Sequence, residues 1–323
     1  MDKKILISVG KKNFPEDVAK LLKPLAEVFY RSLWDEEYDI ILKDSVAVIG
    51  DEERVDEKYL LKAPKLKIFA NFGVGYDSVD VDLCTKRGIY VSNTPGVLSA
   101  AVADFTWALI LGYARKVVAA DSFVRKEWAK YHTEFPFGFD LEDKTLGIIG
   151  LGRIGSEVVK RAKGFGVKII YYDVIHRPDI EREYDVKFTE FDELIRSSDI
   201  ISLHVPLLPS TKHLLGEREF SLMKQTAILI NTSRGAVIDQ EALIKALKNG
   251  QIRGAGLDVF VKEPLPLDDR LIGLENVLLT PHAASGTLET RRKMAMTCAE
   301  NVKAYLEGRY PPNIVPEQKN IAL

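Results

Sequence analysis

Residues 145–173, TLGIIGLGRIGSEVVKRAKGFGVKIIYYD, decide how this chain folds. An apolar run ends in glycine, a glycine-rich turn and a helical stretch follow, and a second apolar run ends in an acid. The turn fits the pattern G-x-G-x-x-G between a strand and a helix. We expect Gly150 to allow a tight turn, Gly152 to let the backbone approach a pyrophosphate, and Gly155 to let helix and strand pack closely. Because a helix N-terminus attracts phosphate, the predicted phosphate-binding residues are Gly150, Gly152, Arg153, Ile154 and Gly155.

The acid that ends the second run, Asp173, indicates which dinucleotide would bind. It lies 18 residues after Gly155 (173 − 155), close to the spacing of about 20 found for a ribose-binding acid. An acid there accepts hydrogen bonds from the ribose and repels a 2′-phosphate, so we predict NAD. NADP stays open as a second cofactor because His176 and Arg177 follow closely. The alternative for the whole segment is a plain helix and turn with a solvated aspartate.

Composition limits the class of protein. With 323 residues, of which 46% are hydrophobic, the chain can build about two domains with large cores. A net charge of −2 gives no basic footprint, which argues against nucleic acid as a partner. Cys84 and Cys298 are too few and too far apart for a disulfide framework, so we expect a cytoplasmic protein. The histidines show no metal-ligand spacing, and no metal site is expected.

One apolar segment, residues 105–114, is too short to span a bilayer, so no membrane association is expected. We interpret it as a buried helix and as a candidate subunit interface, and we expect a homodimer.

Short apolar strands alternate with helical stretches, which predicts parallel sheets covered by helices. The strands expected in the first series are 5–9, 45–49, 66–70 and 88–92. Those expected in the second are 145–150, 167–173, 199–205, 227–231, 254–260 and 276–280. The predicted fold class is α/β, with two doubly wound parallel-sheet domains, one flavodoxin-like for substrate and one Rossmann for nucleotide, and a cleft between them.

The expected substrate domain is discontinuous, with residues 1–98 plus 285–323, and the expected dinucleotide-binding domain is 99–284. A long helix over 99–118 would lead into the second domain, and a helix over 288–307 would return to the first. The proline-rich end of the chain is expected to form an extended tail.

Three polar residues each follow a different strand of the second series: Arg234, Glu263 and His282. Ligands bind beyond the carboxyl ends of strands in such sheets, so we expect the three side chains to converge. Arginine can grip a carboxylate with its planar fork. Histidine is the natural proton carrier near neutral pH, and a neighbouring carboxylate stabilises its imidazolium and fixes its tautomer. The alternatives are an arginine paired with a helix end and a structural histidine.

The segments GLGRIG (150–155), NTSRGAVID (231–239), LDVFVKEP (257–264) and LTPHAAS (279–285), in this order, resemble the NAD(P)-dependent D-2-hydroxyacid dehydrogenase family. NFGVGYDSVD (71–80) resembles the substrate loop of that family. The resemblance runs from about residue 66 to 310. It departs after the histidine, where the family usually has isoleucine and glycine.

The resemblance implies a role for each matched residue. His282 would be the acid/base, Glu263 its partner and Arg234 the substrate clamp, while the N–H groups of Val74 and Gly75 would hold the substrate carboxylate. Further residues implied to line the cofactor site are Val205, Pro206, Thr232, Ser233, Asp258, His282 and Ser285. Asp258 would lie near the nicotinamide; alternatively, it is a strand-end acid bonded to local backbone.

Residues 96–111 and 127–150 are most similar to the glyoxylate/hydroxypyruvate reductase branch. This similarity implies an oxidoreductase that reduces a small 2-keto acid, glyoxylate or hydroxypyruvate, to the D-2-hydroxy acid with NAD(P)H. In that branch an aromatic loop before the glycine turn can approach the active site of the partner or pack at a dimer interface. Its residues here are Trp128, Tyr131, Phe135, Phe137 and Phe139.

The alternatives for the function of the chain are another 2-hydroxyacid dehydrogenase, such as one for D-lactate or phosphoglycerate, and an NAD(H)-sensing binding or corepressor-type protein.

Overall fold

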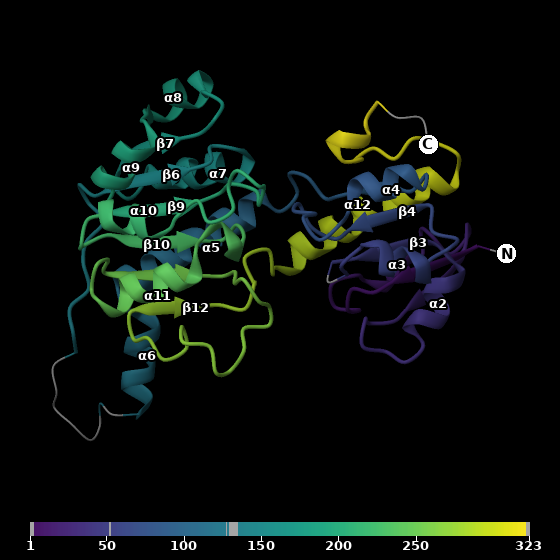
Figure 1. Cartoon of the computed structure of the whole chain (residues 1–323), viewed down its shortest axis with the longest axis horizontal. Coiled ribbons are helices and arrows are strands. Elements are labelled where there is room, and N and C mark those ends of the chain that lie inside the picture. The colour runs from purple at the N-terminus through teal and green to yellow at the C-terminus, as the bar shows by residue number, and fades with distance from the viewer. Residues whose placement is uncertain (1–2, 52, 127, 129–134, 321–323) are drawn as a thin grey trace. The chain divides into compact units, whose positions relative to one another are not determined.

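The computed structural model describes residues 3–51, 53–126, 128 and 135–320. The chain forms two compact units, Met1–Leu98 with Gly286–Leu323, and Ser99–Ser285. Each unit is a parallel sheet with helices packed on it (Figure 1). The predicted fold class, two doubly wound α/β domains, is confirmed.

The sheet of the first unit has the strand order β2-β1-β3-β4-β5, and its neighbouring strands pair in parallel. This is the flavodoxin-like order. The strands are β1 (Lys4–Ile7), β2 (Glu27–Tyr30), β3 (Ser45–Gly50), β4 (Ile68–Asn71) and β5 (Tyr90–Ser92). The helices before the crossover to the second unit are α1 (Glu16–Ala19), α2 (Tyr38–Asp44), α3 (Glu57–Lys62) and α4 (Val81–Lys86). The sequence did not predict β2, because EVFY lies at the sheet edge and has no fully buried residue.

The last long helix, α12 (Leu288–Leu306), belongs to the first unit although it follows the second in sequence. Its hydroxyl cap, Thr287, accepts a hydrogen bond from the N–H of Thr290, which fixes where the helix begins. The helix packs on β4 and α1. The chain therefore returns to the first unit through this helix.

The proline-rich end is extended only in part, so the expectation of an extended tail was incomplete. Val315 donates a backbone hydrogen bond to the carbonyl of Val91, which adds the tail to the edge strand β5. The tail then closes in a short 3₁₀ turn, η2 (Pro316–Gln318), and Gln318 is fully buried. Its side-chain amide bonds the N–H of Val91 and the carbonyl of Ile89. These bonds satisfy backbone groups that β5 would otherwise bury unpaired.

The sheet of the second unit has the order β12-β11-β10-β9-β6-β7-β8, again all parallel. Counted from the first strand of this unit the order is 3-2-1-4-5-6 with one further strand, which is the Rossmann arrangement. Its strands are β6 (Thr145–Ile149), β7 (Lys168–Tyr172), β8 (Lys187–Phe188), β9 (Ile200–Leu203), β10 (Ile228–Asn231), β11 (Gly254–Leu257) and β12 (Val277–Leu279). Its helices after the first two are α7 (Arg153–Ala162), α8 (Pro178–Tyr184), α9 (Phe191–Ser197), α10 (Glu217–Leu222), η1 (Gly235–Val237) and α11 (Gln240–Lys248).

The single helix predicted over 99–118 is wrong, because the chain forms two helices there. These are α5 (Ser99–Ala114) and α6 (Val117–Lys126), and Lys116 between them is left-handed with φ 54°. The carbonyl of Ala114 accepts its hydrogen bond from the N–H of Phe139, so a later segment caps α5 and ends it.

The apolar helix α5 is a core helix of the second unit. It packs on α7, β10, β11 and β12, and the indole Nε1 of Trp107 donates to the carbonyl of Val158 at 2.9 Å. Much of its apolar character is therefore explained within the chain, and the interpretation of 105–114 as a subunit interface stays a prediction. The exposed apolar residues in this region lie instead on α6, which has no buried residue.

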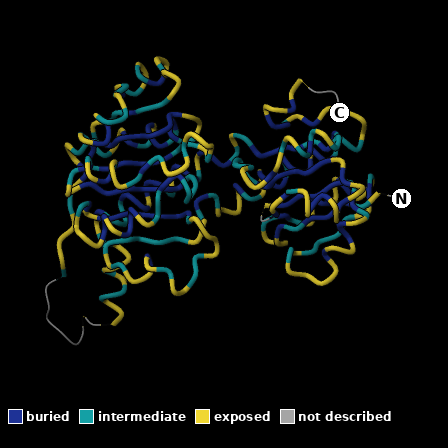
Figure 2. The backbone as a smooth tube through the Cα atoms, viewed as in Figure 1, coloured by how far each residue is buried: buried dark blue, intermediate teal, exposed yellow. Residues whose placement is uncertain are grey.

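The strands form the buried centre of each unit (Figure 2). All residues of β4, β9, β10 and β11 are buried, as expected for parallel strands covered on both faces. Polar residues that follow these strands therefore leave the core at its carboxyl edge. Among the helices in the described ranges, none is long and apolar enough to cross a membrane.

Candidate active site

The three predicted glycines lie within residues 150–155, the turn after β6 and the first residues of α7, which we call the cradle. They have the spacing and surroundings of a dinucleotide site. Gly150 follows β6 with φ +95°, and a Cβ there would lie 2.8 Å from the carbonyl carbon of His204. A Cβ on Gly155 would lie 2.2 Å from the carbonyl oxygen of Gly150, so this glycine brings α7 against the turn. Gly152 is the N-cap of α7, and a Cβ there would meet nothing within 4 Å. The turn therefore leaves room for a pyrophosphate where the helix presents its free N–H groups.

Asp173 stabilises the backbone of this cradle by hydrogen bonds. Its carboxylate accepts hydrogen bonds from the N–H of Leu151 at 2.6 Å and of Ile175 at 3.0 Å. Arg177 donates to the carbonyl of Leu151 at 2.9 Å and forms a two-armed pair with Asp179. The bonds to Asp179 raise the pKa of Arg177 above its ordinary value. Both backbone groups of Leu151 are thus held by charged side chains.

The turn that carries Arg234 is shaped by Asn231, a fully buried residue at the end of β10. Its side-chain oxygen accepts from the N–H and the hydroxyl of Ser233, at 2.9 and 2.8 Å. Its side-chain nitrogen donates to the carbonyl of Arg234 at 2.9 Å. One amide therefore fixes both Ser233 and Arg234. Asn231 was not among the predicted site residues, although an asparagine at the end of an apolar run is a recognisable signal.

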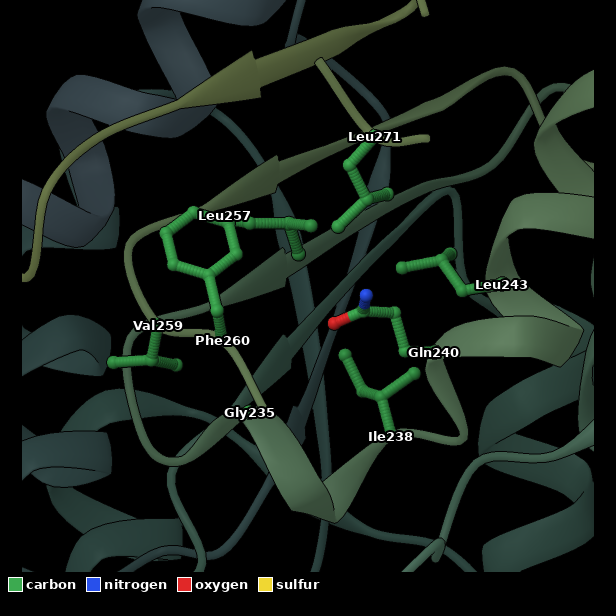
Figure 3. Close-up of a pocket in the computed structure, with 8 residues that line it drawn as sticks. All are labelled: Gly235, Ile238, Gln240, Leu243, Leu257, Val259, Phe260 and Leu271. Atoms are coloured by element: carbon green, nitrogen blue, oxygen red, sulfur yellow. The ribbon is translucent and has the colours of Figure 1, made fainter. Parts of the chain in front are cut away.

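Gly235 brings the Arg234 turn against the segment that leads to Glu263. A Cβ at this position would lie 2.0 Å from the carbonyl carbon of Phe260 and 2.4 Å from the nitrogen of Val261. A small cavity of about 10 Å³ lies behind this contact (Figure 3). Most of the residues that line it are apolar, and Gln240 is the polar one among them. They are Gly235, Ile238, Gln240, Leu243, Leu257, Val259, Phe260 and Leu271. A cavity of this size holds about one water molecule, so a 2-keto acid does not fit in it. The residues around it instead support the backbone on which Arg234 and Glu263 lie.

Glu263 and His282 form a pair. The Nδ1 of His282 lies 2.7 Å from the Oε2 of Glu263, and the other oxygen of Glu263 accepts from the N–H of Phe260 at 2.8 Å. Side-chain exposure is 50% for His282 and 35% for Glu263. Since Nδ1 is bonded to the carboxylate, Nε2 is the nitrogen that can serve a ligand.

Asp258 holds the loop on which His282 lies. Its carboxylate is fully buried and accepts from the hydroxyl of Thr280 and from the N–H groups of Ala283 and Ala284, at 2.6, 2.8 and 2.9 Å. Its carbonyl accepts from the N–H of His282 at 2.8 Å. His282 itself is left-handed with φ 51°. Asp258 is therefore a strand-end acid that bonds the loop around His282, which is distant in sequence, and its predicted place near a nicotinamide stays a prediction.

The charges of His282 and Arg234 act on Glu263. Burial raises the pKa of Glu263. The hydrogen bond and charge of His282, then the N–H of Phe260 and the charge of Arg234, outweigh burial and leave the pKa below its ordinary value. Glu263 is therefore ionised at neutral pH. A second histidine close to the cradle, His204, differs in this respect, because burial lowers its pKa to about 3 and it stays neutral.

The other residues predicted to line the cofactor site lie at the same carboxyl edge. Thr232 is buried and shares a hydrogen bond of 3.0 Å with the hydroxyl of Thr106. Val205 lies against the cradle, 2.9 Å from where a Cβ of Gly150 would be. Pro206 accepts a hydrogen bond from Thr211. Ser285 is the last residue of the second unit. Contact of these residues with a cofactor stays a prediction.

Val74 and Gly75 belong to the first unit, in the loop that follows β4. Both residues are partly exposed, and the next residue, Tyr76, donates its hydroxyl to the tail residue Glu317. Burial, and then the charge of Glu317, raise the pKa of Tyr76 to about 12. The loop is therefore held from the C-terminal tail.

The aromatic residues before the cradle have different surroundings. Trp128 and Phe137 are exposed, at 61% and 94%. The ring of Phe135 packs on Phe123, and that of Phe139 lies under the guanidinium of Arg253. Tyr131 lies outside the described residues.

Known proteins resemble this chain in sequence and in fold. The family model "D-isomer specific 2-hydroxyacid dehydrogenase, NAD binding domain" matches residues 107–284, more than half of the chain. The chain belongs to this dehydrogenase family. The glyoxylate reductase of Thermococcus litoralis is 53% identical over 268 residues, which cover 81% of each chain. That of Korarchaeum cryptofilum is 48% identical over 307 residues and covers 92% of each chain.

Among solved structures of this family, the NADPH-dependent glyoxylate/hydroxypyruvate reductase of Sinorhizobium meliloti, in complex with NADP and malonate, is 31% identical. It superposes with a TM-score of 0.86 over 100% of both chains. The protein is thus an oxidoreductase that binds a nicotinamide dinucleotide, as the glycine cradle predicted.

Replacing Gly235 by alanine is expected to displace the Arg234 turn, because a methyl group cannot fit against the backbone of Phe260. A displacement of about 1 Å can lower activity about 100-fold, so we expect kcat/KM for a 2-keto acid to fall roughly 10- to 100-fold, measured by NADH oxidation. Gly164→Ala is the matched control, because its Cβ would meet nothing within 4 Å. Equal activity of the two variants would contradict this account of the turn.

The lowered pKa of Glu263 predicts a pH dependence of stability. Because folding favours the ionised carboxylate, its contribution is complete above the ordinary value of 4.5 and is lost as the pH falls through the lower pKa of the folded protein. The thermal midpoint of Glu263→Gln is thus expected to lie below that of wild type at pH 6, with a gap that narrows below about pH 4.5. Glu36→Gln, on an exposed residue, is the control. A gap that widens on acidification would refute the prediction.

Proposed function

We propose that the protein is an NADH-dependent reductase that converts glyoxylate or hydroxypyruvate to the corresponding 2-hydroxy acid. The observation that carries the proposal is the 2.7 Å pair of His282 and Glu263, with the charge of Arg234 acting on it, at the carboxyl edge of a Rossmann sheet. The relatives named glyoxylate reductase support the choice of substrate.

In this proposal His282 is the acid/base. Its Nε2 donates a proton to the substrate carbonyl oxygen, and the carboxylate of Glu263 on Nδ1 stabilises the charged imidazolium before the transfer. The bond from the N–H of Phe260 keeps Glu263 from turning away. The same pair accepts the proton back from a 2-hydroxy acid when the reaction runs in reverse.

Arg234 and the loop of the first unit are proposed to bind the substrate. The guanidinium of Arg234 would bind the carboxylate of the substrate and polarise its carbonyl. The N–H groups of Val74 and Gly75 are proposed to donate to a substrate carboxylate. A keto acid offers both a carboxylate and an adjacent carbonyl, which is the pattern that these groups can bind.

The cradle residues fit a dinucleotide, since Gly152 leaves open space at the N-terminus of α7. When bound, the reduced nicotinamide supplies the hydride. Asp173, at the end of β7, would accept hydrogen bonds from a ribose and disfavour a 2′-phosphate. Arg177, although close by, is held by Asp179 and by the carbonyl of Leu151. We therefore propose NADH as the preferred cofactor, with weaker use of NADPH.

We further propose that the protein works as a homodimer in a reducing, cytoplasmic environment. Its cysteines, Cys84 and Cys298, are buried and free. Val117 and Val124 of α6 are 56% and 53% exposed and lie on one face of the helix, seven residues apart. Light scattering is expected to give twice the 36.2 kDa of one chain, and the double variant Val117→Glu, Val124→Glu is expected to give a single chain. A monomeric wild type would overturn this proposal.

The proposed reaction is tested by NADH and NADPH oxidation with a panel of 2-keto acids, comparing wild type with His282→Asn. Asparagine tolerates the left-handed backbone of His282 but is not a proton carrier, so kcat is expected to fall by about 10²- to 10⁴-fold. NADH binding, measured by fluorescence, is expected to persist. His213→Asn is the matched control, because His213 is exposed and also left-handed, with φ 52°.

Equal turnover of the two histidine variants would exclude His282 as the acid/base. Fastest turnover with pyruvate or a phosphorylated keto acid would favour the corresponding other dehydrogenase. Tight NADH binding without turnover of any keto acid would favour an NAD(H)-sensing binding protein.

A further inference from the structure

The loop after β4 is fixed by a buried asparagine that the proposed mechanism does not use. Asn71, the last residue of β4, is 3% exposed. Its side-chain nitrogen donates two hydrogen bonds of 3.0 Å, to the carbonyls of Gly73 and Gly75. A Cβ on Gly73 would lie only 3.3 Å from this nitrogen, so glycine there leaves the amide room. The carbonyl between these two, that of Val74, accepts from the side chain of Asn93 at 2.8 Å.

These bonds determine where the backbone N–H groups of the loop point. In a trans peptide the carbonyl and the N–H of the same plane point in opposite directions, and the cis bond recorded in the described chain lies elsewhere, at Glu263–Pro264. The peptide plane between Gly73 and Val74 contains the carbonyl of Gly73 and the N–H of Val74. The next plane, whose oxygen is bound by Asn93, carries the N–H of Gly75. Both N–H groups therefore point away from the buried amides.

The two N–H groups are available for a ligand. Within the described ranges no acceptor is recorded for the N–H of Val74 or of Gly75, and both residues are partly exposed. Successive N–H groups that point to one side form a nest for an anion. Such a nest binds only while its carbonyls stay on the opposite side, because a rotated plane would present oxygen to the anion.

We propose that Asn71 is a positioning residue for the substrate carboxylate. Its amide, together with the N–H of Thr94, holds the carbonyl of Gly73 on the buried side and so presents the N–H of Val74 to the anion. Its second bond, to the carbonyl of Gly75, fixes the far side of the plane that Asn93 holds, from which the N–H of Gly75 points to the anion. The inference rests on the proposed function, which assigns the carboxylate to Val74 and Gly75. It adds that binding at this loop depends on a donor at position 71, and that an acceptor of the same shape cannot replace it.

The substitution Asn71→Asp gives the sharpest test, because it keeps the shape and replaces the donor by a carboxylate that faces two carbonyl oxygens. Asn71→Ala removes the donor without repulsion and is the second variant, should N71D fold poorly. We expect the KM for glyoxylate to rise roughly 10- to 100-fold, since hydrogen bonds to a charged group carry free energy of that order. The inhibition constant of oxamate, a carboxylate that resembles glyoxylate but is not reduced, is expected to rise by the same factor. The kcat and the Kd for NADH are expected to stay within about threefold of wild type.

A second readout is the pH dependence of KM in the two variants. If Asn71 only stabilised the fold, the KM of N71D relative to that of N71A would not change with pH. Acidification should lower the KM of N71D relative to N71A, because a protonated carboxyl can donate one of the two lost hydrogen bonds. The matched control is Asn276→Ala in the second unit, where the amide likewise donates to two carbonyls, those of Leu247 and Arg253, at 3.2 and 3.4 Å. Asn276 precedes β12, at the opposite edge of the sheet from the proposed acid/base.

The outcomes separate this inference from the proposed function. If wild type reduces no 2-keto acid with either cofactor, the proposed function fails before any variant is compared. If wild type is active and both Asn71 variants show the KM and oxamate inhibition of N276A, the role of Asn71 is refuted while the function stands. A fall in kcat with unchanged KM would also refute it, because a positioned nest acts on binding.

Discussion

The buried carboxylate of Asp258 is the contact on which the proposed active site depends. A charged group without exposure is stable only when its oxygens are hydrogen-bonded, and these oxygens accept from Thr280, Ala283 and Ala284. Because all the donors belong to the loop around His282, the need to satisfy the carboxylate also fixes that loop. His282 is left-handed within it, a conformation that a free histidine rarely adopts. The imidazole therefore meets Glu263 without needing a ligand to organise it.

At two other strand ends, a buried asparagine fixes the following loop by hydrogen bonds. Asn231 ends β10 and bonds the Ser233–Arg234 turn, and Asn71 ends β4 and bonds the loop of Val74 and Gly75. Parallel strands buried on both faces end where the backbone loses its ladder partners, and those groups need new hydrogen bonds. A short amide can supply both a donor and an acceptor at that point. The side chains that satisfy the strand ends thus also orient the groups that we propose to bind substrate.

The sequence predicted most of the fold because parallel strands covered on both faces are continuous apolar runs, which are easily recognised. It missed β2 and β8, which are short and lie at sheet edges. It joined α5 to α6 because the capping of Ala114 by Phe139 is a contact between distant residues. The close approach of Glu263 and His282 followed from strand order. The roles of Asn71 and Asn231 did not, because their importance lies in which carbonyls they contact, and spacing along the chain does not reveal that.

The surroundings of Asp173 show why nearby residue types alone do not set cofactor choice. Arg177 lies beside this acid, and an arginine at such a place could bind a 2′-phosphate. Its guanidinium, however, is already bonded to Asp179 and to the carbonyl of Leu151. Contact with a phosphate would break those bonds, free the charge of Asp179, whose pKa the arginine lowers to about 2, and leave Leu151 less firmly held in the cradle. In the proposed preference for NADH, the same bonds that stabilise the glycine turn would therefore disfavour NADP, so that the choice of cofactor and the shape of the phosphate site would depend on one set of contacts.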